Sequence, residues 1–404
     1  MAQFFPFQAL RPSKEAAEVV SCLPYDVLSE AECRKLAAEP DSFIHVIRSE
    51  ADLEPGTDPY GTEVYAQAAA SLNSMKDRGV LKADEKPCYY LYREITPDHT
   101  QTGIVGTVSS EEYEAGIIRR HELTVAEKED DRTRHILACR AQTGPVFLTF
   151  PEDEIIAEVI ARVSASEPSI DFETNEVRHQ VWVIDQEDEQ EVLREAFAKI
   201  PVLYIADGHH RAASSLRAAK QLNTSDQEEA GRFMAVAFPA GDLCLLGYHR
   251  YVCDLNGKSE SEVLEEIKRN FDVECCGDTR IPEAIHEIVM LLNGTRYLLR
   301  PHCSLYQPDD SIGRLDVSIL QKFLLEPVLG IHDPRRDHRI TFVGGMHGEE
   351  EIKVRCETTD SIGFLLYPTD IHDLIAVADD HGIMPPKSTW FEPKLLSGLF
   401  VHEI

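Results

Sequence analysis

The chain has 404 residues, of which 43% are hydrophobic, so it can bury a substantial core and exceeds the usual size of one compact domain. Its 71 acidic residues against 40 basic ones give a formal net charge of −31, which disfavours a DNA or RNA surface without strong segregation of basic residues. Neither a secretory leader nor a membrane span is recognisable, and the ten cysteines contain no C-x-x-C pair, so we expect a soluble cytoplasmic protein with reduced thiols.

Helices and strands alternate in the first part of the chain. Ser29 and Glu32 have the spacing of a capping box, which predicts a helix that runs to about Ala38. Apolar residues recur on successive helical turns between 60 and 76, which predicts an amphipathic helix there. The remaining predictions for this part are strands over 43–47, 89–93 and 103–108.

The alternation continues through the middle of the chain and changes after Cys253. Helices are predicted over 111–120, 125–140, 155–164, 186–198, 260–270 and 317–324, and strands over 145–150 and 180–184. This order of elements favours a mixed α/β or α+β fold. We expect a main α/β domain over 1–252 and a C-terminal α+β region over 253–404 that packs on it.

The most informative segment is VLYIADGHHRAA at residues 202–213. Its apolar start suits a buried strand, Gly208 permits a tight turn, and the alanines suit a helix. His209, His210 and Arg211 occupy the first helical turn, where the helix dipole normally favours Asp or Glu. The pattern predicts a helix start that binds an anion such as phosphate.

Purely structural interpretations of two turns stay open. Asp207 can be an ordinary N-cap, with the following histidines solvated or bonded to nearby carbonyls. Pro24-Tyr25-Asp26 can likewise be a simple turn in which the carboxylate accepts nearby N–H groups.

The segment HELTVAEKEDDRTRH at 121–135 is the richest in polar residues. It can place an acid, a base and metal-binding carboxylates around a polyanionic substrate. Such charge runs are also typical of a solvated helix with ion pairs one turn apart, here Asp130 with Arg134 and Asp131 with His135. The segment lacks H-E-x-x-H, which excludes the common zinc-protease arrangement.

Near the C-terminus, IMPPKSTWFEPKLLSGLF at 383–400 interleaves Lys387 and Lys394 with proline and aromatic residues. These lysines can reach phosphate oxygens, or they can face solvent while the segment docks as an ordinary terminus. The chain has no Walker, G-x-G-x-x-G or G-x-S-x-G motif. It therefore lacks the sequence signatures of P-loop proteins, of Rossmann dinucleotide-binding proteins and of α/β-hydrolases.

Several motifs together resemble the large bacterial and archaeal family catalogued as domain of unknown function 1015. The motifs are PFQALRP, LPYDV, SFIHVIR, QTGIVGTVS, HELTVAEKEDDRTRH, PVFLTFP, VRHQVWVI, IADGHHRAAS and MPPKSTWFEPKLLSGL. The resemblance covers nearly the whole chain, in order. It implies membership of a mostly uncharacterised family that is often associated with serine-biosynthesis genes.

A second resemblance is local. The strand that leads into Asp207-Gly208-His209-His210-Arg211 is similar to the phosphate-binding turn of the ParB and sulfiredoxin superfamily, which includes free serine kinases. This resemblance implies a ParB/sulfiredoxin-like core elaborated by additional α/β segments. It also implies that Asp207 positions a metal or the hydroxyl substrate, that Gly208 and His209 offer N–H groups, and that His210 and Arg211 bind phosphate.

The leading hypothesis is a phosphotransferase that moves a phosphoryl group from ATP or ADP, with Mg²⁺, to a small hydroxyl metabolite such as free serine. Glu122 is the candidate for the glutamate base that the resembling kinases share, and Asp207 and His121 complete the predicted catalytic residues. Asp131 and Asp207 are the predicted metal ligands. The predicted nucleotide-binding residues are Gly208, His209, His210, Arg211, Arg132, His135, Lys387 and Lys394.

Two other classes of function remain open. A metal-dependent phosphatase or hydrolase would use His121, His135 and His209 with Asp130 or Asp131 as metal ligands. A nucleotide-binding regulator or a DNA-partition-like module is suggested by the turn alone, and the net charge of −31 makes DNA contact the weakest alternative. The expected partners are a nucleotide and a small substrate, without nucleic acid or membrane, and a homo-oligomer remains open.

Overall fold

The computed structural model describes residues 2–357 and 360–404. These residues divide into two compact units, Met1–Leu243 with Pro393–Ile404, and Cys244–Glu392. The first unit therefore ends nearer residue 243 than 252, and it includes residues 393–404, which the sequence analysis assigned to the second region. Helices and strands occur in both units, so the predicted mixed α/β class is confirmed.

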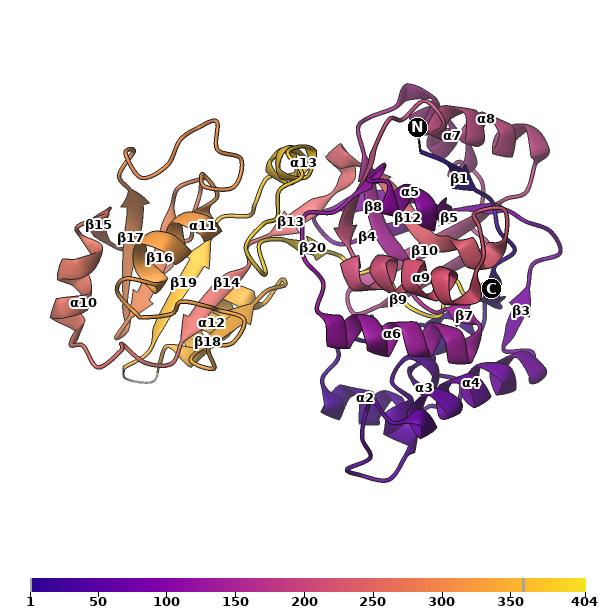
Figure 1. Ribbon diagram of the computed structural model, residues 1–404, viewed down its shortest axis with the longest axis horizontal. Coiled ribbons are helices and arrows are strands. Elements are labelled where there is room, and N and C mark those ends of the chain that lie inside the picture. The colour runs from indigo at the N-terminus through magenta and orange to yellow at the C-terminus, as the bar shows by residue number, and fades with distance from the viewer. Residues whose placement is uncertain (1, 358–359) are drawn as a thin grey trace. The chain divides into compact units, whose positions relative to one another are not determined.

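The first unit is built on a large mixed sheet with the strand order β6-β11-β8-β12-β5-β4-β10-β9, and β1 also pairs with β5 (Figure 1). The β6–β11 and β8–β12 pairs are parallel and the other pairs are antiparallel. β12 is buried almost throughout, as expected of a strand inside a covered sheet. The strands are β1 (Phe4–Phe5), β4 (Tyr89–Ile95), β5 (Thr100–Ser109), β6 (Ile118–Arg119), β8 (Val146–Phe150), β9 (Ile170–Thr174), β10 (Val177–Ile184), β11 (Leu203–Asp207) and β12 (Arg232–Pro239).

Helices and short strand pairs surround this sheet. The capping box at Ser29 and Glu32 is present at the start of α2, which confirms the predicted helix signal. The helices are α1 (Ala17–Val20), α2 (Glu30–Leu36), α3 (Ile44–Ile47), α4 (Thr62–Asp77), α5 (Ser110–Glu114), α6 (Ala126–Cys139), α7 (Glu154–Val163), α8 (Glu187–Phe197) and α9 (His209–Leu222). β2 (Leu10–Pro12) pairs with β3 (Leu81–Ala83), and β7 (Ala141–Gln142) pairs with β21 (His402–Glu403).

Two predicted elements differ from the structure. The run over 43–47 is helical in α3 rather than extended, because four apolar residues and one histidine are too few to show a periodicity that separates the two states. The predicted helix over 111–120 ends at Glu114, and the chain then turns through Gly116 at φ 75° into β6. Glycine favours this left-handed conformation, which stops the helix.

The second unit contains an antiparallel sheet with the strand order β15-β17-β16-β19-β14-β18 (Figure 1). Its strands are β14 (His249–Val252), β15 (Phe271–Cys276), β16 (Ile288–Leu292), β17 (Thr295–Pro301), β18 (Ile340–Val343) and β19 (Ile362–Leu366). Its helices are α10 (Glu260–Ile267), α11 (Asp316–Leu320), a π-helical turn over Gln321–Leu325, α12 (Gly348–Arg355) and α13 (Ile371–Asp379). A separate pair joins β13 (Cys244–Leu246) to β20 (Trp390–Glu392).

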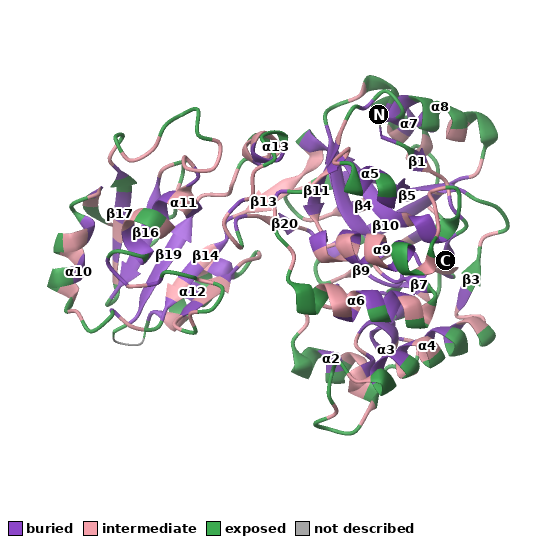
Figure 2. Cartoon of the chain, viewed as in Figure 1, coloured by how far each residue is buried: buried purple, intermediate pink, exposed green. Residues whose placement is uncertain are grey.

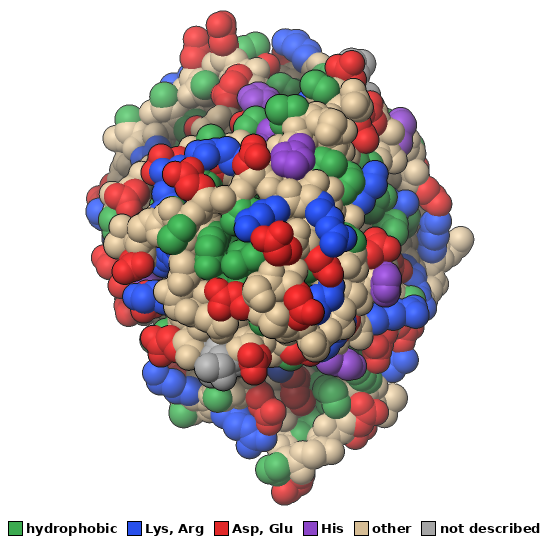
Figure 3. Space-filling model, turned by 90° about the vertical axis from the view of Figure 1, so that its left-hand side faces the viewer, with side chains coloured by type: hydrophobic (Ala, Val, Ile, Leu, Met, Phe, Trp, Pro, Cys, Tyr) green, Lys and Arg blue, Asp and Glu red, His purple; other side chains and the backbone are tan. Residues whose placement is uncertain are grey.

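Burial follows the layers. Buried residues concentrate on the strands of both sheets, while outer faces of helices such as α8 and α10 are exposed (Figure 2). On the face shown in Figure 3, acidic and basic side chains are interspersed, and no broad basic region is visible there. Within the described part of the chain, none of the helices combines the length and apolar character needed to cross a membrane.

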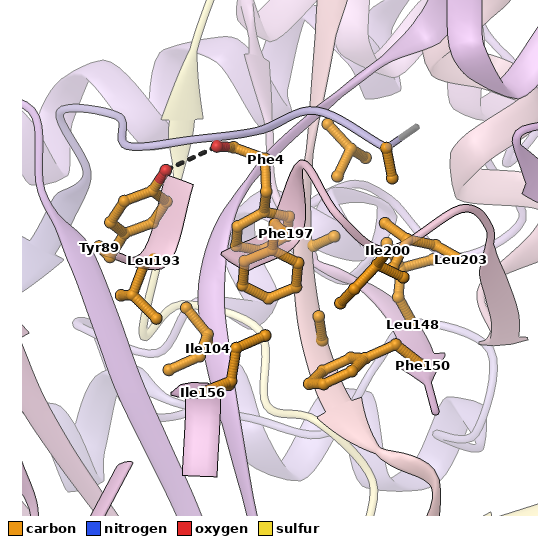
Figure 4. Close-up of a cluster of buried hydrophobic side chains, with 14 of the residues drawn as sticks. Phe4, Tyr89, Ile104, Leu148, Phe150, Ile156, Leu193, Phe197, Ile200 and Leu203 are labelled. Atoms are coloured by element: carbon orange, nitrogen blue, oxygen red, sulfur yellow. Dashed lines mark hydrogen bonds between the residues drawn. The ribbon is translucent and has the colours of Figure 1, made fainter. Parts of the chain in front are cut away.

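The main core of the first unit lies where α7 and α8 meet the sheet (Figure 4). The Phe4 ring stacks on Phe197 with 4.3 Å between centroids, and Phe150 meets Phe197 edge-on at 5.4 Å. The Tyr89 hydroxyl donates to the Phe4 carbonyl oxygen at 2.6 Å, which satisfies a buried polar group inside this apolar cluster. This packing holds the strands that carry the candidate site.

Candidate functional site

The candidate site begins at the turn between β11 and α9. β11 lies between β6 and β8 in the sheet, and α9 starts directly after Gly208, as the sequence predicted. Gly208 has φ 92°, a conformation that side chains disfavour. A Cβ atom at this position would lie 3.0 Å from Cζ of Arg211, so the guanidinium folds closely over the glycine. The turn therefore requires glycine for two independent reasons.

Asp207 lies between two cations. Its Oδ2 is 3.4 Å from a terminal nitrogen of Arg211 and 3.6 Å from Nζ of Lys394. Burial favours the neutral acid, but Lys394 and Arg211 outweigh it and hold the pKa of Asp207 well below its ordinary value. Arg211 also donates to the carbonyl oxygen of Pro145. This trio of side chains carries one more positive than negative charge.

His209 and His121 are buried beside this trio, with 3% and 2% of their surface exposed. Their rings meet edge-on with 4.5 Å between centroids. Burial lowers the pKa of His121 to about 4 and holds that of His209 well below its ordinary value. Both shifts favour the neutral imidazole, so the positive charge at the start of α9 comes mainly from Arg211 and Lys394.

The hydrogen bonds of His209 assign its tautomer. Its Nε2 accepts the backbone N–H of His121 at 3.5 Å, so the neutral ring carries its proton on Nδ1. Nδ1 lies 3.9 Å from Oε2 of Glu122, whose side chain is 34% exposed. His209 thus connects the buried start of α9 to a carboxylate that solvent can reach.

His210 has a structural partner. Its Nε2 accepts the backbone N–H of Val125 at 3.1 Å, and Val125 is the N-cap residue of α6. This bond satisfies one of the N–H groups that every helix start leaves without an intrahelical acceptor. The geometry favours a role for His210 in joining α9 to α6 over the phosphate contact that the sequence suggested.

Arg132 and Asp131 form an internal pair in α6. The Arg132 guanidinium lies 2.8 Å from Oδ2 of Asp131 and 4.2 Å from the centroid of the Tyr25 ring. Tyr65 donates its hydroxyl to Oδ1 of Asp131 at 3.0 Å. Both oxygens of this carboxylate therefore have protein partners, which disfavours the metal-ligand role predicted for Asp131.

His135 packs inside the first unit rather than against an open site. Its Nε2 lies 2.8 Å from the carbonyl oxygen of Val46, so it donates there and ties α6 to α3. Burial lowers the pKa of His135 to about 4. The predicted pair with Asp131 does not form among the described contacts, whereas the predicted pair of Asp130 with Arg134 does.

The space beside Arg211 is small. A cavity of about 30 Å³ is lined in part by Tyr25, Arg132, His135, Arg211 and Ser215. This volume is close to that of a single water molecule. The side chains of Asp207 and Glu122 are 32% and 34% exposed, so solvent reaches the site from their side.

The two lysines of the C-terminal segment belong to different units. Lys394 lies in the first unit with Asp207, whereas Lys387 lies in the second unit, where its Nζ is 5.6 Å from the centroid of the Tyr248 ring. Among the described residues, no group of three or more His, Cys, Asp or Glu side chains is arranged to hold a metal ion. Mg²⁺ commonly uses one or two carboxylates together with substrate phosphates, and Asp207 is a carboxylate at the start of α9.

Comparison with known proteins identifies the family. The family model described as a protein of unknown function, DUF1015, matches residues 4–318. The chain belongs to this family. No curated protein matches the chain.

The solved structures that match this family member share little sequence with it and align with low TM-scores. SbnI with a C-terminal truncation, from Staphylococcus aureus, is 13% identical with a TM-score of 0.38, over 72% of this chain and 85% of that one. A free serine kinase in complex with AMP is 10% identical with a TM-score of 0.36, over 70% and 86%. A conserved hypothetical protein from Pyrococcus furiosus is 11% identical with a TM-score of 0.35, over 72% and 91%.

Sequence reasoning missed some contacts of the site. Tyr25, which stacks on Arg132, lies in a turn that the sequence singled out only for its carboxylate, and Tyr65 gave no signal beyond its helix. Gly144 also approaches Arg211, since a Cβ added to Gly144 would lie 3.8 Å from Cδ of Arg211. No signal in the sequence indicated this approach. The Thr-Gly-Pro sequence at 143–145 marks a turn, but only the fold brings that turn to α9.

Proposed function

We propose that the chain is a nucleotide-dependent phosphotransferase that transfers a phosphoryl group to a hydroxyl of a small metabolite, with free serine as the first acceptor to test. The observation that carries this proposal is the ionised Asp207 held between Arg211 and Lys394 at the start of α9. Phosphoryl transfer depends mainly on positioning and charge neutralisation. A cluster with excess positive charge at a helix start suits both requirements.

Arg211 and Lys394 are the proposed phosphate-binding side chains. Their side chains are only 11% and 10% exposed, so they are held in place rather than mobile in solvent. The N-terminus of α9 adds the partial positive charge of its backbone, and its first turn lacks acidic side chains that would oppose an anion. Asp207 keeps the two cations aligned and retains an exposed face.

Glu122 is the proposed base. Nδ1 of His209 lies 3.9 Å from the Glu122 carboxylate. At this distance the ring can orient the carboxylate electrostatically, while the carboxylate oxygens remain able to accept hydrogen bonds from a substrate. A hydroxyl that attacks the terminal phosphorus would form the new P–O bond and transfer its proton to Glu122. The bond from that phosphorus to the bridging oxygen would break, and the nucleotide would leave with one phosphate fewer. His121 acts through its backbone N–H, which fixes the His209 ring, so it is a positioning residue in this proposal.

Mg²⁺ would bind to Asp207 together with the nucleotide, where it neutralises the negative charge of the phosphates. The resemblance of the Asp207–Arg211 turn to the ParB and sulfiredoxin superfamily supports the same assignment. A metal-dependent hydrolase receives less support, because Asp131 and His135 are already bonded to protein groups. Asp130 likewise contacts Arg217 at 2.8 Å.

The test is a product screen. The full chain is incubated with ATP or ADP, Mg²⁺ and hydroxylated amino and organic acids, and phosphorylated products are sought by mass spectrometry. A phosphorylated acceptor supports the proposal. Nucleotide binding without turnover would instead support a regulator, and phosphate release from a phosphorylated metabolite would support a phosphatase.

Matched variants assign the residues. Arg211→Ala should weaken nucleotide binding about 10- to 100-fold in calorimetry, because it removes a charge-assisted contact. Arg217→Ala removes the same charge from the same helix and should leave binding unchanged, since Arg217 pairs with Asp130. Glu122→Gln should lower kcat about 10²- to 10⁴-fold with little change in nucleotide affinity, whereas Glu127→Gln on an exposed position of α6 should not.

A further inference from the structure

The second unit contains a cavity that the proposed phosphoryl transfer does not use. Its volume is about 420 Å³, which is within the range of small-molecule sites. Its wall combines the end of β19 and the start of α13 with the start of α11 and the loops around Ile285 and Tyr306. All of its lining residues lie within Cys244–Glu392.

Two acidic groups of this wall, Asp373 and Asp316, are paired with basic side chains, and Asp370 caps α13. Arg314 donates to Oδ1 of Asp373 at 2.5 Å, and Asp370 accepts the backbone N–H of His372 at 2.7 Å as the N-cap of α13. Asp316 is bonded to His286. A charged ligand would have to compete with these pairs, so the wall favours an uncharged one.

His286 is held in one orientation. Its backbone N–H and its Nδ1 both donate to the Asp316 carboxylate, with Nδ1 and Oδ1 2.9 Å apart. Because a carboxylate accepts hydrogen bonds, Nδ1 carries a proton, so Nε2 of the uncharged ring is an acceptor. No partner of this Nε2 is found among the described residues. The residue has φ 65°, so the Asp316 bonds also stabilise a backbone conformation that is rarely populated.

Aromatic rings complete the wall. The Tyr306 ring lies 4.2 Å from the His286 ring with 36° between their planes, and Tyr248 and Tyr367 also line the cavity. Tyr248 is itself fixed edge-on against Trp390 with 5.2 Å between centroids. The position of the neighbouring Ser388 is fixed by a hydrogen bond, in which its carbonyl oxygen accepts from the Thr369 hydroxyl at 2.8 Å. These contacts hold Tyr306 and Tyr248 in place and leave the wall with aromatic surface.

We propose that this cavity binds an uncharged, planar heteroaromatic molecule that packs against Tyr306 and donates an N–H hydrogen bond to Nε2 of His286. The site is separate from the cluster around Asp207, which lies in the other unit. Its occupant is recognised by shape, by aromatic packing and by one hydrogen bond.

Two matched probes test the proposal on the full chain. Indole carries an aromatic N–H, and 1-methylindole has the same ring system without it. In ligand-observed NMR titrations we expect saturable binding of indole with a Kd of about 1 mM or tighter, which is reasonable for a ligand of this size. We expect 1-methylindole to bind about tenfold more weakly, because it leaves the acceptor of His286 without a donor.

Variants locate the binding. His286→Asn keeps a residue type that tolerates positive φ but cannot place an acceptor where Nε2 lies, so the preference for indole should disappear. Tyr306→Ala should weaken both probes about tenfold, while Tyr60→Ala, at a 40% exposed tyrosine of the first unit, should change neither. Circular dichroism melting curves confirm that each variant is folded.

Three outcomes would overturn the proposal. They are the absence of saturable binding by both probes, an unchanged preference for indole in folded His286→Asn, and equal effects of the two tyrosine substitutions. Arg211→Ala should leave indole binding unaffected, so failure of the nucleotide site and failure of this cavity are distinguishable.

Discussion

At the residue scale, Gly208 determines how closely Arg211 approaches the backbone. Gly208→Ala would place a side chain at φ 92° and its Cβ 3.0 Å from Cζ of Arg211. The left-handed conformation alone costs about 1–2 kcal/mol, so we expect a larger loss, about 2–3 kcal/mol, in the free energy of unfolding measured in urea. Gly116 has a similar φ of 75°, but a Cβ added there would meet no atom within 4 Å. Gly116→Ala should therefore lose only the part of the unfolding free energy that comes from the left-handed conformation. Equal losses in the two variants would refute the close contact.

The buried histidines predict a pH dependence of stability. Because the folded-state pKa of His135 is about 4, the unfolded chain binds more protons than the folded one between that value and the unfolded value of about 6.5. Stability is therefore full above about pH 6.5 and decreases as the pH falls toward 4.

Denaturant titrations at pH 8 and pH 5 check this dependence. On going from pH 8 to pH 5, His135→Gln should lose about 2 kcal/mol less unfolding free energy than the wild type, because it cannot take up that proton. The comparison at pH 8 measures the cost of the substitution itself. An identical pH dependence in the two proteins would contradict the buried, neutral state of His135.

At the scale of elements, the site depends on the contact between α6 and α9. His210 accepts from Val125 at the start of α6, Ser214 donates to the Glu129 carbonyl oxygen at 3.2 Å, and Arg217 bonds to Asp130. These bonds hold Glu122, which precedes α6, near the start of α9.

His210→Ala should therefore destabilise this contact. We expect a loss of about 1 kcal/mol in unfolding free energy, typical of a lost helix cap, together with faster hydrogen exchange of the first amides of α6. Lys128→Ala at an exposed position of α6 is the control. Unchanged exchange in His210→Ala would show that the bond to Val125 does not hold the helix start.

Elements with a repeated pattern were predicted well. The helix over 60–76 corresponds to α4, and the helix over 125–140 corresponds to α6. The run over 43–47 was predicted wrongly, because its four buried apolar residues and one half-buried histidine, His45, span too few positions to reveal a period. So short a run suits a strand and a buried helical turn equally.

At the scale of the whole molecule, the chain ends inside the first unit. Leu395, Leu396, Leu399, Phe400 and Val401 are each at most 3% exposed, and β21 pairs with β7. Each such side chain contributes about 1.5–3 kcal/mol when buried, and the total stability of a domain is only about 5–15 kcal/mol.

Removal of 393–404 should therefore unfold the first unit. We expect loss of its cooperative unfolding transition by circular dichroism and calorimetry. Lys394→Met keeps the segment and its apolar contacts, so this variant should fold and lose nucleotide affinity only. A truncated chain that retains a full first-unit transition would show that the segment is dispensable.

The sequence by itself determined the features that depend on neighbouring residues. It identified the turn at Asp207 and Gly208, the cationic start of α9 and the long helices, because backbone preferences and helical periodicity act over a few positions. The tertiary structure alone decided that Lys394 meets Asp207, that His209 is buried against His121, and that the second unit forms a cavity beside His286. These features depend on burial and on contacts between distant segments, because protonation and pairing follow the environment that packing creates.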